Sequence, residues 1–272
     1  MNAETPKAEE LSLPQAFLLL ATNDKDGEPQ LPAYVLRTTL AGAILAELDL
    51  LGAIALEGKH VKATGAAPDT EFQRELDRIR EKPRPHTPKR WVSMLEGRGE
   101  VQRVYERMAS LGIVEHVGEK HLGLFKSVRY PEKDHSPEAA LMQKIRAVVI
   151  PAPAPAARPV AESPGAESPG GVPPGGVQPR ATEPETVLPE AVRPDAAQPV
   201  GQVSGATPPV AAPPDARTTA LIALLQAAEL LGTLFPEADL SRARELAKNH
   251  WPSRAVEDEL RMIRLTLVET AP

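Results

Sequence analysis

The sequence predicts a mainly α-helical protein: a helical bundle with surrounding amphipathic helices and two small β-hairpins, interrupted by a disordered proline-rich insert. Three observations support this prediction. Apolar residues recur at helical spacing, as at Leu40, Ile44 and Leu48. Aromatic residues make up only 3% of the 272 residues, so the core must be built from aliphatic side chains. Seventeen of the 30 prolines lie between Pro151 and Asp215.

Capping signals place the first helices and the first hairpin. Ser12-Leu-Pro-Gln15 has the form of a capping box and opens a short helix that ends near Ala21. A second helix begins at Thr39 and ends before Gly52, because glycine suits the left-handed position after a helix. Two short segments at residues 53–56 and 60–63 flank Glu-Gly-Lys and predict a hairpin.

The later elements follow the same rules. A second hairpin pairs residues 113–114 with residues 122–125. The segment from Thr219 to Phe235 is nearly all apolar, and a helix that is apolar on most sides is a buried one. Capping residues and apolar stripes predict further helices after Asp69, after Thr87, over residues 101–111, after Ser136, and over residues 239–249 and 253–270.

The insert separates two stretches of one domain. Residues 149–215 lack Phe, Trp, Tyr and Lys, so they cannot bury enough apolar surface to offset their chain entropy. We interpret them as a disordered Pro/Gly/Ala-rich linker. A buried helix is not stable in an isolated stretch of about 55 residues. We therefore expect residues 216–270 to complete the domain that residues 11–148 begin.

Charge and composition exclude several classes of function. The net charge of −6 comes mostly from the linker, which has 3 basic and 7 acidic residues, so general affinity for nucleic acid is not expected. The absence of cysteine excludes disulfides, thiolate nucleophiles and cysteine metal sites. No apolar stretch approaches the roughly 18–20 residues of a membrane span, and the polar N-terminus is not a signal peptide. We expect a cytoplasmic protein that is peripherally associated with the cytoplasmic face of a membrane.

The sequence contains none of the common catalytic motifs, such as a Ser-His-Asp signature, a glycine-rich phosphate loop or His-Glu-x-x-His. The spacing of His116 and His121 can suit a metal, but we interpret both as polar residues of an exposed hairpin. Asp24, Asp26 and Glu28 alternate as in a calcium loop that lacks its glycine and distal glutamate, so a solvated turn is the better interpretation. We expect no enzymatic activity, no cofactor and no metal site.

Basic residues are concentrated between residues 82 and 107. They form either a solvated helix surface or a shallow anion site, where arginine binds phosphate and apolar neighbours touch lipid. The order helix, Gly112, strand, turn, strand is also that of a winged-helix wing. However, the prolines of residues 83–88 break the helix-turn-helix that would precede it, and acidic Glu106 lies on the helix. DNA binding is therefore the less favoured alternative.

A series of motifs in collinear order resembles the lipid-binding domain of the Golgi phosphoprotein 3 family, over about residues 11–148 and 216–270. The motifs are Asp26-Gly27, the segment from Leu40 to Gly52, Ala67-Pro68, Trp91, Leu111-Gly112-Ile113, Leu122-Gly-Leu-Phe125 and Arg129-Tyr130-Pro131. The resemblance implies a non-enzymatic peripheral membrane protein that binds phosphatidylinositol 4-phosphate and recruits enzymes through their cytosolic tails. It also implies a homo-oligomer formed through the hairpin from Val114 to Phe125.

The resemblance also implies a headgroup site, because the lipid pocket of the family uses one tryptophan and three arginines. The tryptophan position is Pro32 here, and the arginine of the glycine-rich helix is Ala41. The other two arginines fall on Arg98 and Val101. With neighbouring side chains included, the candidate residues for an anionic lipid headgroup are Tyr34, Arg37, Arg98 and Arg103. The alternative is a soluble protein–protein scaffold that has kept the fold without the lipid site.

Overall fold

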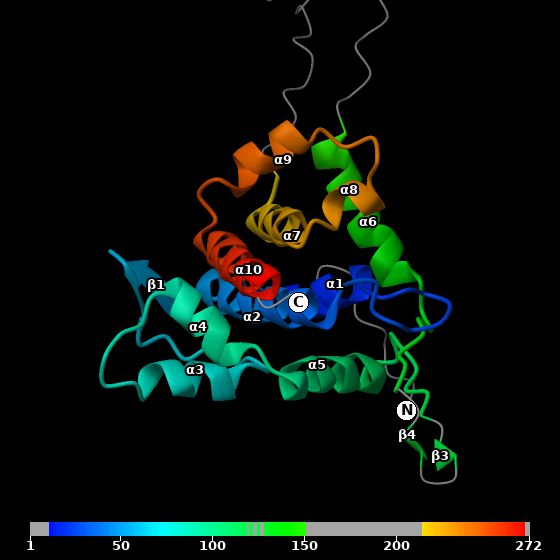
Figure 1. Ribbon diagram of the computed structural model, residues 1–272, viewed down its shortest axis with the longest axis horizontal. Helices are drawn as coiled ribbons and strands as arrows, with labels where there is room; N and C mark the ends of the chain where they lie inside the picture. The colour runs from blue at the N-terminus through cyan, green and yellow to red at the C-terminus, as the bar shows by residue number, and fades with distance from the viewer. Residues whose placement is uncertain (1–10, 119, 122–123, 126–127, 151–213, 270–272) are drawn as a thin grey trace, which may run out of the picture. The chain divides into compact units, whose positions relative to one another are not determined.

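The computed structural model describes residues 11–118, 120–121, 124–125, 128–150 and 214–269 (Figure 1). These residues form a mainly helical structure with two short antiparallel hairpins, which confirms the predicted fold class. The proline-rich segment that we interpret as a linker falls on residues 151–213, outside the described residues.

The elements follow one another in a regular order along the chain. They are α1 (Leu13–Leu20), α2 (Ala33–Leu50), β1 (Ile54–Glu57), β2 (His60–Ala63), α3 (Gln73–Arg80), α4 (Pro88–Leu95), α5 (Arg98–Ser110), β3 (Lys120–His121), β4 (Leu124–Phe125), α6 (Ser136–Val149), α7 (Ala216–Ala227), α8 (Leu231–Leu234), α9 (Leu240–Ala247) and α10 (Trp251–Glu269).

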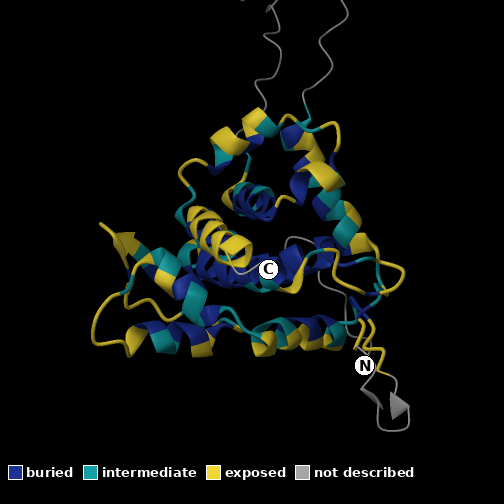
Figure 2. Cartoon of the chain, in the orientation of Figure 1, coloured by how far each residue is buried: buried dark blue, intermediate teal, exposed yellow. Residues whose placement is uncertain are grey.

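Helix α2 lies at the centre of the fold. It contacts α1, α4, α5, α7 and α10, and nearly all of its residues from Val35 to Leu48 are buried. Figure 2 shows α2 and α7 dark blue along most of their length, whereas the outer helices carry exposed faces. The core is aliphatic as the composition predicts, with Trp91 and Phe17 among the few aromatic side chains that it buries completely. Burial of this apolar surface is the main favourable contribution to folding.

Helices that follow residues 151–213 pack into the same hydrophobic core as those that precede them. Helix α7 contacts α1 and α2, while α10 contacts α2 and α4. The described residues on both sides of this segment belong to one compact unit. The core around α2 is therefore built from both stretches of the chain.

The three largest differences from the sequence-based expectations lie at the start of α2, between α7 and α8, and in the second hairpin. Helix α2 begins at Ala33 instead of Thr39, because Pro32 in an extended conformation directly precedes it. The apolar stretch expected as one helix divides into α7 and α8, since Glu229 adopts a left-handed backbone with φ of 59°. The second hairpin has a different register: Val114 bridges Glu132, and only short strands lie at its end.

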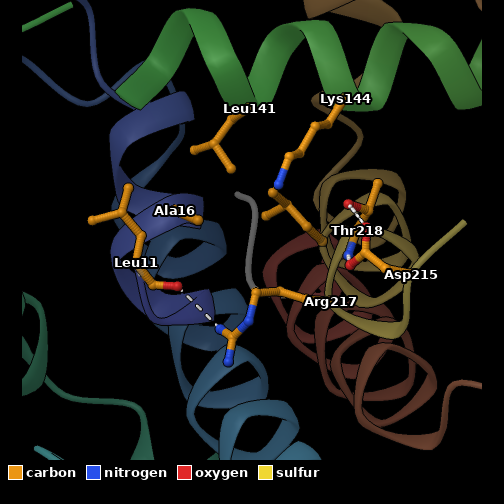
Figure 3. Close-up of a pocket in the computed structure, with 8 residues that line it drawn as sticks. Leu11, Ala16, Leu141, Lys144, Asp215, Arg217 and Thr218 are labelled. Carbon is orange, nitrogen blue, oxygen red and sulfur yellow. Dashed lines mark hydrogen bonds between the residues drawn. The ribbon is translucent and has the colours of Figure 1, made fainter. Parts of the chain in front are cut away.

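A pocket of about 350 Å³ lies among α1, α6 and α7 (Figure 3). Leu11 and Leu141 contribute apolar walls, and the side chain of Lys144 extends from α6 toward α7. The polar groups of α7 bind one another here, because Asp215 accepts hydrogen bonds from the Thr218 backbone N–H (2.8 Å) and from the Thr218 hydroxyl (2.7 Å). This is an N-terminal cap, and it orders the start of α7.

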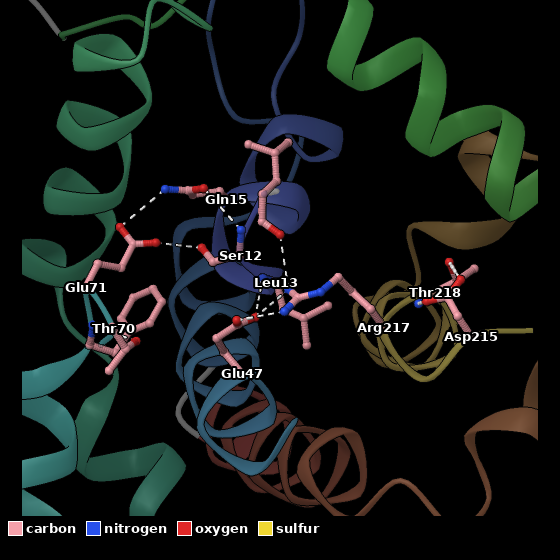
Figure 4. Close-up of polar contacts among 11 residues, drawn as sticks. Ser12, Leu13, Gln15, Glu47, Thr70, Glu71, Asp215, Arg217 and Thr218 are labelled. Carbon is pink, nitrogen blue, oxygen red and sulfur yellow. Dashed lines mark hydrogen bonds and ion pairs between the residues drawn. The ribbon is translucent and has the colours of Figure 1, made fainter. Parts of the chain in front are cut away.

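An ion pair joins α7 to α1 and α2 beside this pocket (Figure 4). Arg217 donates from Nη1 to Glu47 Oε2 (2.7 Å) and from Nη2 to Glu47 Oε1 (2.9 Å). Nη1 also donates to the Leu11 carbonyl (3.0 Å), and the Leu13 N–H donates to Glu47 Oε2 (2.7 Å). The buried Glu47 carboxylate thus accepts hydrogen bonds from one of the otherwise free N–H groups at the start of α1 and from two nitrogens of the Arg217 guanidinium.

Gly42 lies where α2 and α10 pack closely, and replacing it with alanine is expected to destabilise the fold. A Cβ atom at residue 42 would lie 2.1 Å from Cγ2 of Val256, a fully buried β-branched side chain. Overpacking costs about 1–3 kcal/mol, which exceeds the helix propensity that alanine gains, so we expect Gly42→Ala to lower the free energy of unfolding by about 1–2 kcal/mol. Urea denaturation followed by circular dichroism measures this change.

The double variant Gly42→Ala/Val256→Ala tests the cause of this loss. Because the second substitution removes the clashing methyl group, we expect the double variant to be more stable than the sum of the two single effects predicts. Additive effects, or a Gly42→Ala variant as stable as the unmodified chain, would show that α2 and α10 are not in close contact at this point.

Candidate functional site

A pocket between α2 and α5 brings two of the four candidate headgroup residues together. It has a volume of about 240 Å³, and we call it the α2–α5 pocket. Its lining residues come from the loop after α1, from α2, from α5 and from the segment before α6: Gly27, Pro29, Ala33, Leu36, Arg37, Arg98, Val101, Gln102, Tyr105, Val128 and Tyr130. Arg37 and Arg98 are the two charged members of this set.

Helical periodicity explains why these side chains share one cavity. On α5, residues 98, 101, 102 and 105 follow the i, i+3, i+4, i+7 pattern of a single helix face. On α2, residues 33, 36 and 37 form the corresponding face at the first turns of the helix. The two faces lie opposite each other because α2 packs against α5.

The two arginines supply the positive charge of the pocket. Arg37 is half-buried and donates from Nε to the Ala33 carbonyl (3.0 Å), which orients its guanidinium along α2. Arg98 is exposed at the first position of α5. Neither arginine forms an ion pair with a residue that the structure describes. Their charges are therefore available to an anionic ligand.

Two stacked tyrosines contribute to the wall of the pocket. The rings of Tyr105 and Tyr130 are parallel within 2°, with centroids 4.4 Å apart. Tyr105 Oη hydrogen-bonds to Thr22 Oγ1 (2.7 Å), and burial raises the pKa of Tyr105 to about 12. Burial, together with the charge of Glu106, also raises the pKa of Tyr130. Both hydroxyls stay neutral at physiological pH, so the wall adds no negative charge that would repel an anion.

Gly27 holds the loop after α1 against the segment before α6. Its φ is +67°, and a Cβ atom there would lie 2.2 Å from the backbone nitrogen of Pro131. The Gly27 carbonyl accepts a hydrogen bond from the Tyr130 N–H (3.1 Å). Only glycine allows both this conformation and this close approach, so residue 27 sets the edge of the pocket.

The other two candidates have partners elsewhere. Arg103 Nη2 lies 2.5 Å from Oε1 of Glu75 on α3, whose side chain is fully buried. Tyr34 lies beside Arg264 of α10, and Glu229 and Tyr34 both raise the pKa of that guanidinium. Neither candidate lines the α2–α5 pocket. Their role in lipid binding stays a prediction, as does that of Arg37 and Arg98.

The positions that correspond to the family's lipid-binding residues are divided in the same way. Arg98 and Val101 line the α2–α5 pocket. Ala41 is buried in the core and Pro32 is exposed, and neither lines the pocket. The resemblance therefore pointed to the face of α5 that lines the pocket, whereas it did not single out Arg37 among the arginines of the pocket.

A second group of ionisable side chains was missed by the sequence analysis. Asp24, Glu132, His135 and Glu138 each offer one ligand atom, and these atoms all lie within 4.8 Å of one another. Burial and the neighbouring carboxylates raise the pKa of Glu138 to about 8, and burial also raises the pKa of Glu132. The regular spacing of three between residues 132, 135 and 138 was a signal in the sequence, but Asp24 joins the group only through the fold.

Comparison with known proteins identifies the family of the chain. No curated protein matches the sequence of this chain. Among the described residues, no helix is long and apolar enough to cross a lipid bilayer. The family model of Golgi phosphoprotein 3 (GPP34) matches residues 13–263, which include all ten helices of the described residues except the last residues of α10. The chain therefore belongs to the Golgi phosphoprotein 3 (GPP34) family.

Proposed function

We propose that the protein binds the anionic headgroup of a membrane lipid in the α2–α5 pocket and thereby associates peripherally with a membrane. The observation that carries this proposal is the pair Arg37 and Arg98 at a pocket whose other lining residues carry no charge. Guanidinium groups form paired, charge-assisted hydrogen bonds to phosphate oxygens. A phosphate between α2 and α5 would contact both arginines.

The apolar residues of the pocket fit the same role. Val101 and Val128 line it beside the arginines, and Val128 is 49% exposed. Such side chains can contact the acyl region of a bilayer while the arginines contact the headgroup layer. The headgroup that the family resemblance implies is phosphatidylinositol 4-phosphate, and we propose it as the first ligand to test.

Two further roles belong to the proposal through family membership. One is recruitment of membrane enzymes through their cytosolic tails. The other is a homo-oligomer formed through residues 114–125. Within this segment Lys120 pairs with Phe125, and Val117 forms a β-bridge to Arg129, which follows the segment. In this arrangement the hairpin adjoins the segment of Val128 and Tyr130, so self-association would bring several α2–α5 pockets to one membrane surface.

Liposome flotation of the full chain tests the lipid proposal. Vesicles of phosphatidylcholine alone are compared with vesicles that also contain phosphatidylinositol 4-phosphate or phosphatidylserine. Because a hydrogen bond to a charged group contributes about 1.5–3 kcal/mol, we expect Arg37→Ala/Arg98→Ala to weaken binding at least about tenfold. Binding should also weaken as salt is raised, since exposed charges are screened.

The control variant is Arg84→Ala/Arg90→Ala, which also removes two exposed arginines but none that lines the pocket. We expect this variant to bind vesicles like the unmodified chain. If the chain does not float with any anionic vesicle at low salt, the lipid proposal is wrong. Equal losses in the two double variants would instead show a diffuse electrostatic attraction without a headgroup pocket.

One observation favours a second function, that of a protein–protein scaffold. Large apolar side chains are exposed on the last turns of α10, and they are Met262, Leu265, Leu267 and Val268, with exposures of 48–75%. Exposed apolar groups that gather on one element are typical of protein contact surfaces. Recovery of a specific partner without vesicles, together with no flotation, would favour this function over lipid binding.

A further inference from the structure

We propose that Asp24, Glu132, His135 and Glu138 form a binding site for a divalent metal ion of the Mn²⁺ or Zn²⁺ type. The site lies where the loop after α1 meets the start of α6, outside the residues that line the α2–α5 pocket. Figure 1 shows this loop beside the first turns of α6. Family membership plays no part in the proposal, which rests on the geometry and the burial of these four side chains.

The geometry suits a single ion. Each residue offers one oxygen or nitrogen atom, and all four atoms lie within 4.8 Å of one another. Metal–ligand bonds to His and carboxylate are about 2.0–2.2 Å long, so two ligands of one ion lie at most about 4.4 Å apart. Side-chain shifts of less than about 1 Å would bring the four atoms to bonding distance.

The burial of Glu132 is the independent observation that points to a ligand. Its side chain is only 3% exposed, and Oε2 contacts Nδ1 of His135. The other oxygen, Oε1, is buried and has no hydrogen-bond partner among the described residues. An unsatisfied buried carboxylate oxygen is costly, and a cation in contact with it removes that cost.

The carboxylates of the cluster have no Lys or Arg ion-pair partner among the described residues. No Lys or Arg in the described part of the chain forms an ion pair with Asp24, Glu132 or Glu138. Arg129, three residues before Glu132, pairs instead with Glu28 (2.6 Å), which is not a member of the cluster. With all three carboxylates ionised, the cluster has a formal charge of about −3, which a divalent ion would largely neutralise.

Backbone hydrogen bonds hold the ligands in place before any ion binds. The Glu132 N–H donates to the Asp24 carbonyl (3.1 Å), which joins the two segments that supply the ligands. The Lys133 and Asp134 N–H groups both donate to the Ile113 carbonyl (2.8 and 3.2 Å). Asp134 Oδ1 then accepts from the Ser136 N–H (2.9 Å) at the turn into α6, which places Glu138 beside Glu132. Such preorganisation lowers the entropic cost of binding.

The chemistry of the donors selects the class of metal. Carboxylate oxygens alone would suit Mg²⁺ or Ca²⁺, whereas an imidazole nitrogen in the set favours Mn²⁺ or Zn²⁺. The His135 side chain is 69% exposed, so an ion and its remaining water ligands can enter from solvent. A competing state has no metal and shares a proton between Glu138 and Glu132, which agrees with the raised pKa of Glu138.

Metal titration of the full chain distinguishes the two states. After treatment with EDTA and dialysis, MnCl₂, ZnCl₂, CaCl₂ and MgCl₂ are added separately without lipid, and binding is followed by calorimetry and by the Tm. We expect one Mn²⁺ or Zn²⁺ per chain and a Tm increase of about 5–10 °C at saturation, with smaller increases for Ca²⁺ and Mg²⁺.

The variant His135→Gln/Glu138→Gln is expected to lose both the binding and the Tm increase. The matched control is His60→Gln/Asp69→Asn, which removes an exposed imidazole and an exposed carboxylate outside the cluster, and it should respond like the unmodified chain. A chain whose Tm and calorimetric signal respond to none of the four ions overturns the proposal and supports the shared proton. The same conclusion follows if His135→Gln/Glu138→Gln binds Mn²⁺ or Zn²⁺ as tightly as the control.

Discussion

Replacing Arg217 with alanine is expected to lower the free energy of unfolding by about 3–5 kcal/mol. The substitution removes both guanidinium hydrogen bonds to Glu47, whose side chain is only 6% exposed. The carboxylate would then keep the Leu13 N–H as its single hydrogen-bond donor in the described part of the chain. Breaking a buried pair by removal of one partner is costly because the remaining charge stays desolvated. Urea denaturation followed by circular dichroism measures the loss.

Two further variants separate this effect from a general loss of positive charge. Arg264→Ala breaks the exposed pair with Glu229, whose side chains are 42% and 68% exposed, and we expect it to cost less than about 1 kcal/mol. Arg217→Met/Glu47→Gln removes both charges and keeps an acceptor for the Leu13 N–H, so it should be more stable than Arg217→Ala. If Arg217→Ala costs no more than Arg264→Ala, the buried pair does not stabilise the junction of α7 with α1 and α2.

Replacing Arg103 with alanine is expected to lower the free energy of unfolding by a similar amount, about 3–5 kcal/mol. Arg103 is the described ion-pair partner of Glu75, which has no exposed surface and whose Oε2 has no hydrogen-bond partner among the described residues. The variant Arg103→Met/Glu75→Gln should recover part of the loss, since it leaves no unpaired charge. Denaturation of the three proteins under one set of conditions measures these differences.

The same variants decide between two roles for Arg103. In flotation assays well below its Tm, Arg103→Ala is expected to bind vesicles like the unmodified chain, because Arg103 does not line the α2–α5 pocket. Arg90→Ala, which removes an exposed arginine of the same basic stretch, serves as the control for both measurements. A variant that keeps its stability but loses flotation would place Arg103 in the headgroup site instead.

Local signals in the sequence were sufficient for most of the helices. Ser12 precedes α1 and its N–H donates to the Gln15 side chain (3.1 Å), while Thr87 accepts from the Arg90 N–H (3.4 Å) at the start of α4. The first hairpin pairs Ile54 with Ala63, as its apolar segments and central turn predicted. These features depend on residues only a few positions apart, so both partners of each interaction can be recognised in the sequence.

An interaction between distant residues accompanies one of the boundaries that were predicted incorrectly. The left-handed backbone at Glu229 interrupts an otherwise apolar helical segment, and its carboxylate pairs with Arg264 of α10 (2.6 Å). A left-handed backbone at a residue other than glycine costs conformational free energy, so local propensity alone does not predict it. The start of α2 at Ala33 has a local cause instead, because Pro32 directly precedes the helix and the apolar repeat from Thr39 onward did not mark it.

The candidate site shows the same division. On a helix of 3.6 residues per turn, residues 98 and 103 lie about 140° apart, so helical spacing alone already separates Arg103 from the face of Arg98. No local pattern relates Arg98 to Arg37, or Asp24 to Glu138, since these pairs come from different elements.

By itself, the sequence determined the helical class, the aliphatic core, the starts of most helices and the family, because periodicity, capping and collinear motifs are short-range properties of the chain. Only the tertiary structure decided which charged groups are neutralised and which remain available. Arg103 and Arg217 pair with buried carboxylates from other helices, whereas Arg37 and Arg98 line a pocket. A charged side chain pairs with a group that lies within a few ångströms of it. Packing decides which distant segments come that close, and the spacing of residues along the sequence does not contain that information.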